Sequence, residues 1–158
     1  MNKNLSTLTV RELLAAYVQA LGELKNRGVL RTSNNPVGDY TEWLVANTLG
    51  LKLLGNSTAA YDAVDNIGVK YPIKGRRQTP ENMSTQLGMF HNLNNGGFDY
   101  LIAILFHPDF TPRIVVKVPH AVVAQYSRFH AYNNAHILHI QGSWLTDSRV
   151  EHITNLFV

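Results

Sequence analysis

Asp62 and Lys74 flank a predicted tight turn at residues 65–68 and could do chemistry together. In a hairpin with this turn, Asp62 lies opposite Pro72 and diagonal to Lys74. Hydrolysis of a phosphodiester with Mg²⁺ needs hard oxygen ligands and a cation that holds the attacking water or the developing charge. Asp62 and Lys74 supply such a pair if the two strands adopt this register.

Glu42 could add a second carboxylate, although each of the three residues also has a structural explanation. Glu42 stands three residues after Asp39, which is the spacing of a helix capping box. Asp62 could be a surface residue beside a turn, and Lys74 could be a solvated strand lysine. Only the combination of the three favours a site over these alternatives.

Positive charge is concentrated close to Lys74. The chain has a formal charge of +3 and a pI near 9.3, which only hints at a polyanionic partner. Side chains following Lys74 could hold the phosphates that flank a cleaved one, and a solvated basic face is the alternative. The candidate nucleic-acid-binding residues are Lys70, Arg76 and Arg77, with Arg31 and the amide of Gln86 as weaker candidates.

Other catalytic chemistries find no support. The chain has no cysteine, which excludes thiolate zinc sites, disulfides and cysteine nucleophiles. Its seven histidines show no HExxH-type spacing, and no GxSxG motif accompanies them. A metal would therefore need oxygen or imidazole ligands.

The elements that must position these residues follow from capping signals and periodicity. A capping box at Thr9 and Glu12 predicts a helix as far as Gly28, and Asp39 is expected to cap a second helix that runs to about Gly50. Further strands are expected at 59–64, 69–74, 100–106, 113–118 and 135–140, and further helices at 80–93, from Pro119 onward and at 147–157. This order predicts a three-layer α/β fold, with a mixed central sheet flanked by helices.

Three segments together resemble the PD-(D/E)XK nuclease superfamily, which has a restriction-endonuclease-like fold. Gly38-Asp39-Tyr40-Thr41-Glu42-Trp43 is similar to its helix, Tyr61-Asp62-Ala63-Val64-Asp65 to its first strand and Tyr71-Pro72-Ile73-Lys74-Gly75-Arg76-Arg77 to its second. The resemblance covers 38–77 and is nearest to small uncharacterised bacterial members. The length of 158 residues predicts one domain over 1–158. The resemblance divides it into an N-terminal helix and loop at 1–37 and a nuclease-like core at 38–158.

The resemblance also implies the site. Glu42, Asp62 and Lys74 would be catalytic, and Mg²⁺ or Mn²⁺ would be held by Glu42, Asp62 and the backbone carbonyl of Ile73. The chain departs from the family pattern at Pro72, where an acidic or amide ligand is expected. Either the remaining oxygens and water suffice, or the site no longer cuts.

These observations lead us to expect a metal-dependent endonuclease-like protein that acts on DNA. One alternative is an inactive nuclease-fold module that binds nucleic acid or a protein partner, and another is a subunit of a larger restriction or repair system. We expect a homodimer, because a domain this small covers few base pairs. We expect no membrane association and a cytoplasmic location, since no apolar run approaches the ~20 residues of a membrane helix.

Overall fold

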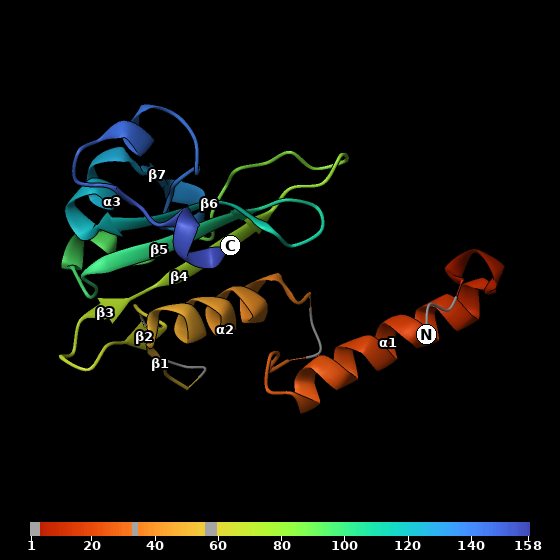
Figure 1. Ribbon diagram of the computed structural model, residues 1–158. Helices are drawn as coiled ribbons and strands as arrows, with labels where there is room; N and C mark the ends of the chain where they lie inside the picture. Colours follow the sequence, from red (N-terminus) through yellow and green to blue (C-terminus); the bar gives the residue numbers. More distant parts are fainter. Residues whose placement is uncertain (1–3, 33–34, 56–59) are drawn as a thin grey trace. The chain divides into compact units, whose positions relative to one another are not determined.

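The computed structural model describes residues 4–32, 35–55 and 60–158 (Figure 1). The chain divides into two compact units, Met1–Tyr40 and Thr41–Val158. Each unit is described by itself below. Within the described ranges, no helix combines the length and the apolar character that a bilayer crossing requires.

The N-terminal unit contains a 3₁₀ turn, η1 (Leu5–Thr7), and helix α1 (Val10–Asn26). The predicted capping box is confirmed, because the hydroxyl of Thr9 accepts a hydrogen bond from the backbone N–H of Glu12, and the Glu12 carboxylate accepts one from the N–H of Thr9. No side chain of α1 is buried. Among the described residues of this unit, its apolar stripe is therefore not buried.

Helix α2 (Val37–Leu49) begins before Asp39, so the prediction that Asp39 caps it is wrong. The side chain of Asn35 accepts from the N–H of Val37 at the helix start instead. The Asp39 carboxylate accepts from the backbone N–H groups of Arg31 (2.9 Å) and Thr32 (2.8 Å). Since Asp39 is inside the helix, it cannot be the N-cap of a capping box with Glu42.

A small antiparallel sheet carries Asp62, in the order β1 (Lys52–Leu53), β2 (Ala63–Val64) and β3 (Lys70–Tyr71). The predicted hairpin is confirmed: Ala63 pairs with Tyr71, and this register places Asp62 opposite Pro72. Strand β1 was not predicted. Residue 59 of the expected strand lies outside the described residues.

The larger sheet has the order β4 (Ile73–Arg77), β5 (Tyr100–Phe106), β6 (Pro112–Pro119) and β9 (Glu151–His152). Strands β4 and β5 are parallel, whereas the other pairs are antiparallel, so the sheet is mixed. Strand β5 has the predicted bounds and is buried along almost its whole length. The fold class is α/β.

The two faces of this sheet pack against different elements. On one face, Leu101 and Leu105 of β5 join a core with Val122 of helix α3 (His120–Tyr126), the helix expected after Pro119. On the other face, α2 approaches β4 so closely that a Cβ atom on Gly75 would overlap the Thr41 hydroxyl. Figure 1 shows α2 and α3 on opposite sides of the strands.

The helix predicted at 80–93 is absent, because the backbone of this segment bonds to another strand. The N–H groups of Leu87 and Phe90 donate to the carbonyls of Leu138 and His136. Leu87 and Phe90 are nevertheless buried, as is Leu93 at the start of the 3₁₀ turn η2 (Leu93–Asn95). The spacing of these apolar residues correctly predicted that they are buried, but the helix predicted from the same spacing is wrong.

The helix predicted at 147–157 is also wrong. Strand β9 and a 3₁₀ turn, η5 (Thr154–Phe157), occupy this segment, after another 3₁₀ turn, η4 (Ser143–Thr146). The carbonyl of Val115 in β6 accepts from the N–H of Ile153, and this pairing replaces helical hydrogen bonds.

The strand expected at 135–140 is present as β8 (Ala135–Ile137). It pairs with β7 (Arg128–His130), which was not predicted, and a 3₁₀ turn, η3 (Ala131–Asn133), joins the two strands.

Candidate functional site

Asp62 is held at the point where the chain passes from the small sheet to the large one. Its backbone N–H donates to the carbonyl of Tyr71 (2.9 Å), and its carboxylate Oδ2 accepts from the backbone N–H of Ile73 (2.7 Å). One carboxylate oxygen is thus bonded to the first residue of β4. This bond fixes the side chain beside the edge of that strand.

Pro72 lies between β3 and β4. The extended chain before it belongs to the small sheet, and the extended chain after it belongs to the large sheet. The Pro72 carbonyl accepts from the N–H of Ile102 in β5 (3.0 Å), whereas the next N–H, from Ile73, bonds Asp62. Backbone groups of successive strand residues point to opposite edges. The Ile73 carbonyl therefore faces the same edge as Asp62, in line with its expected role as a ligand.

Lys74 pairs with Ala103 across the parallel strands and shares its face of the sheet. Its ammonium lies 5.0 Å from the centre of the Phe90 ring, and a Cβ atom on Gly88 would come within 3.3 Å of its Cδ. The aliphatic stem is therefore covered by the segment that follows β4.

The charges of Asp62 and Glu42 both affect the pKa of Lys74. Burial lowers the pKa of Lys74, while the negative charges of Asp62 and Glu42 raise it, and the net result is a pKa below the ordinary value for lysine. Glu42 follows Thr41, whose side chain is buried against Gly75 next to Lys74. Packing of α2 on β4 thus carries Glu42 close enough for its charge to act on Lys74.

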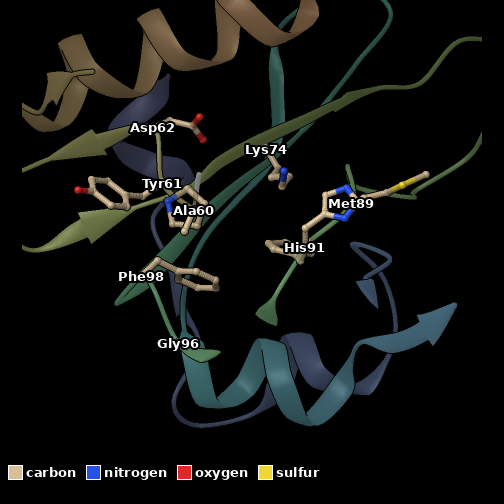
Figure 2. Close-up of a pocket in the computed structure, with 10 residues that line it drawn as sticks. Ala60, Tyr61, Asp62, Lys74, Met89, His91, Gly96 and Phe98 are labelled. Atoms are coloured by element: carbon tan, nitrogen blue, oxygen red, sulfur yellow. The ribbon is translucent and has the colours of Figure 1, made fainter. Parts of the chain in front are cut away.

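A cavity of about 240 Å³ opens beside these groups (Figure 2). Asp62 and Lys74 line it together with side chains that sequence reasoning did not assign to the site: Tyr61, Met89, Phe90, His91 and Phe98. Figure 2 shows Tyr61 on one side of the cavity and Met89 and His91 on the other. Met89, Phe90 and His91 belong to the segment mistaken for a helix, so the sequence did not indicate that they lie beside Asp62 and Lys74. Tyr61, next to Asp62, was the one that its position could have revealed.

The two arginines after Lys74 point to opposite faces of β4. Arg76 shares the face of Lys74, and its Nε donates to the backbone carbonyl of Gln86 (2.5 Å). The Nε of Arg77 donates to the carbonyl of Pro108 (2.7 Å), and its guanidinium lies 4.6 Å from the centre of the Phe110 ring. Of the two arginines, Arg76 is thus the one on the face of Lys74, and neither arginine nor Gln86 is among the residues that line the cavity.

Lys70 and Arg31 complete the expected basic set. The Lys70 ammonium lies 5.4 Å from the centre of the Tyr61 ring, so it adds positive charge beside the cavity wall. Arg31 belongs to the N-terminal unit, where its backbone N–H bonds Asp39. The structure thus brings Lys70 to the site, and it describes Arg31 only within its own unit.

The oxygen donors at the site fit a hard divalent cation. Carboxylates and a backbone carbonyl are the ligand types that Mg²⁺ and Mn²⁺ take, and Mg²⁺ usually keeps several waters besides one or two carboxylates. Of the expected ligands, Asp62 lines the cavity, whereas Glu42 and Ile73 are not among its lining residues. The hydrogen bond from Ile73 goes to Oδ2 of Asp62 and not to Oδ1. Among the described residues, no group of three or more His, Asp or Glu side chains is arranged to hold a metal.

Comparisons with known proteins do not name the class of this α/β protein. No protein-family model matches the chain, and no curated protein matches it significantly. The function of the site has to be argued from its residues.

Proposed function

We propose that the protein is a divalent-metal-dependent endonuclease-like enzyme that hydrolyses phosphodiester bonds in DNA. The observation that carries this proposal is a partly buried lysine, Lys74, that lines a cavity together with Asp62 and whose pKa is affected by the charge of Glu42. A lysine with a lowered pKa beside a carboxylate in a cavity is typical of functional sites.

We further propose that the fold is the three-layer restriction-endonuclease-like one. In support, the three segments that resemble the superfamily adjoin one another: α2 packs on β4, and Asp62, just before β2, bonds the first residue of β4. Helices on both faces of a mixed sheet also agree with this fold.

In the proposed mechanism, Glu42, Asp62 and the Ile73 carbonyl would hold the cation. A bound Mg²⁺ would lower the pKa of its water and screen the phosphate charge. As an ammonium, Lys74 donates hydrogen bonds that hold the attacking water and stabilise the charge developing on the phosphate. Arg76, on the same face, contributes positive charge to a flanking phosphate. Two such chains as a homodimer would suit a double-strand cut.

Pro72 favours a second candidate function, in which the nuclease fold binds nucleic acid or a protein without cutting. The chain has no ligating side chain where the family pattern expects one, and Pro72 instead separates β3 from β4. Salt-sensitive DNA binding that does not depend on Mg²⁺ would favour this module. If the protein does not bind DNA even at low salt, the remaining candidate function is that of a subunit that binds other proteins.

Nicking of supercoiled plasmid in Mg²⁺ or Mn²⁺ tests the leading proposal, with Asp62→Asn as the variant. Asparagine keeps an oxygen that accepts from Ile73, so the fold should survive while a metal ligand is lost. Asp109→Asn, in an exposed turn, is the matched control. We expect nicking by wild type and D109N but not by D62N; equal nicking by all three would refute the assignment of Asp62.

A further inference from the structure

A second cavity, of about 240 Å³, lies beside the β7–β8 hairpin and shares no lining residue with the cavity of Asp62. Its lining includes Arg128, His130 and His139, which are all exposed. Arg128 and His130 are two residues apart in β7, so they project from the same face of the hairpin. Three side chains that can carry positive charge therefore meet at one cavity.

No negative charge in the cavity balances these side chains. Among the described residues that line it, none is acidic, and the stretch 110–146 contains no Asp or Glu. Asp147, which follows this stretch, accepts from the hydroxyl of Tyr126 in the wall (3.2 Å) and is paired with Arg149 (2.8 Å). The charge around the cavity therefore favours an anionic ligand.

The guanidinium of Arg128 is available for such a ligand. Within the described ranges, the side chains of Arg128 and His130 make no hydrogen bond or ion pair. The other arginines of the larger unit all donate to an oxygen of the protein: Arg76, Arg77, Arg113 and Arg149. A guanidinium whose donors are not used in this way can bind two oxygens of one phosphate.

The segment after β4 connects this cavity to the strand that carries Lys74. Gln86 pairs with His139, and the carbonyl of Gln86 accepts from Nε of Arg76, which shares the face of Lys74. The hydroxyl of Thr85 lies 3.4 Å from Nδ1 of His139. A DNA strand with one phosphate beside Lys74 continues with further phosphates, and this cavity lies on the path that they can follow.

We propose that Arg128, His130 and His139 form a second phosphate-binding site, which holds a backbone phosphate of the DNA away from the cleaved one. This inference rests on the proposed nuclease function. Arg128 supplies charge-assisted hydrogen bonds to the phosphate oxygens, and the two imidazoles add donors. Such a contact positions the DNA and carries no sequence information.

Binding of the full-length chain to a DNA duplex without metal tests this site, with Arg128→Gln as the variant. Arg128 is exposed, so the substitution should leave the fold intact. We expect R128Q to bind about tenfold more weakly at low salt, and the slope of log K against log salt to fall by about 0.9, the value for one phosphate contact. Lys52→Gln removes the same charge from an exposed position on β1 and is the matched control. Unchanged affinity of R128Q, or an equal loss in K52Q, would overturn the inference.

The ring signals of the histidines locate the contact. When the same duplex is titrated into the protein, the NMR signals of the His130 and His139 rings should shift. The ring of His107, in the exposed turn between β5 and β6, is the control and should not shift. Absence of a shift at both His130 and His139 would overturn the inference.

Plasmid nicking separates this inference from the proposed function. R128Q should raise the DNA concentration that gives half-maximal nicking, whereas D62N should abolish nicking at every concentration. Metal-dependent nicking with the same DNA dependence in wild type and R128Q would support the nuclease and overturn the second phosphate site. DNA binding that requires Arg128, without nicking by the wild type, would support the phosphate site and overturn the nuclease.

Discussion

The pKa of Lys74 depends on two opposing effects. Burial favours the neutral amine, while Asp62 and Glu42 favour the charged form, and burial is the larger effect. The sequence predicted that Glu42, Asp62 and Lys74 form one site, and the charges of both carboxylates do act on Lys74. It could not predict the burial, because Lys74 is covered by Gly88 and Phe90, in a segment whose path depends on pairing with β8.

The pKa of Lys74 should respond to each carboxylate separately. Because both negative charges raise it, Glu42→Gln and Asp62→Asn should each lower the pKa of Lys74 further below that of an exposed lysine. An NMR titration of the Lys74 side chain measures this, with Glu81→Gln, at an exposed position, as the control. A pKa that does not change in either variant would mean that the three groups do not form one site.

Asp39 should make the start of α2 sensitive to acid. Burial raises its pKa, but hydrogen bonds from Thr32 and Arg31 outweigh burial and lower it below its ordinary value. The stabilisation is therefore present above the ordinary pKa of aspartate and is lost as the pH falls through the lowered one. Asp39→Ala should reduce hydrogen-exchange protection of the Arg31 and Thr32 amides by about 1–2 kcal/mol at neutral pH. Unchanged protection would show that these bonds do not hold the loop.

At the scale of elements, sequence patterns succeeded where an element is long and failed where pairing with a partner defines it. Helix α1 has a capping box and strand β5 has a continuous apolar run, and both were predicted. Strands β1 and β9 have two residues each, which is too short for any period. The cover that Gly88 and Phe90 give Lys74 was missed because hydrogen bonds to Leu138 and His136 define the path of this segment.

The close contact of α2 with β4 should leave no room for a methyl group added at Gly75. Gly75→Ala would place Cβ on the Thr41 hydroxyl and push the helix that carries Glu42 away from the strand. We expect a loss of about 3 kcal/mol in the free energy of unfolding, measured by chemical denaturation. Gly22→Ala, in α1 with nothing within 4 Å, should instead stabilise by up to about 1 kcal/mol. A tolerated Gly75→Ala would contradict the close approach.

At the scale of the whole molecule, the small positive charge means that local clusters must carry any binding to DNA. Affinity for a single strand should fall with salt, and Lys70→Ala should reduce the slope of log K against log salt by about 0.7, the value for one phosphate contact. Lys52→Ala, on β1, should leave the slope unchanged. Equal slopes for wild type and K70A would remove Lys70 from the interface.

The central claim is that Glu42 and Asp62 form one cation site beside Lys74, and calorimetric titration of Mn²⁺ and Mg²⁺ into the full-length chain tests it most directly. The account predicts binding by wild type and D109N, and loss of binding in both E42Q and D62N. Absence of binding in the wild type would contradict it and would mean that, with Pro72 in place of a ligand, the cavity serves binding alone.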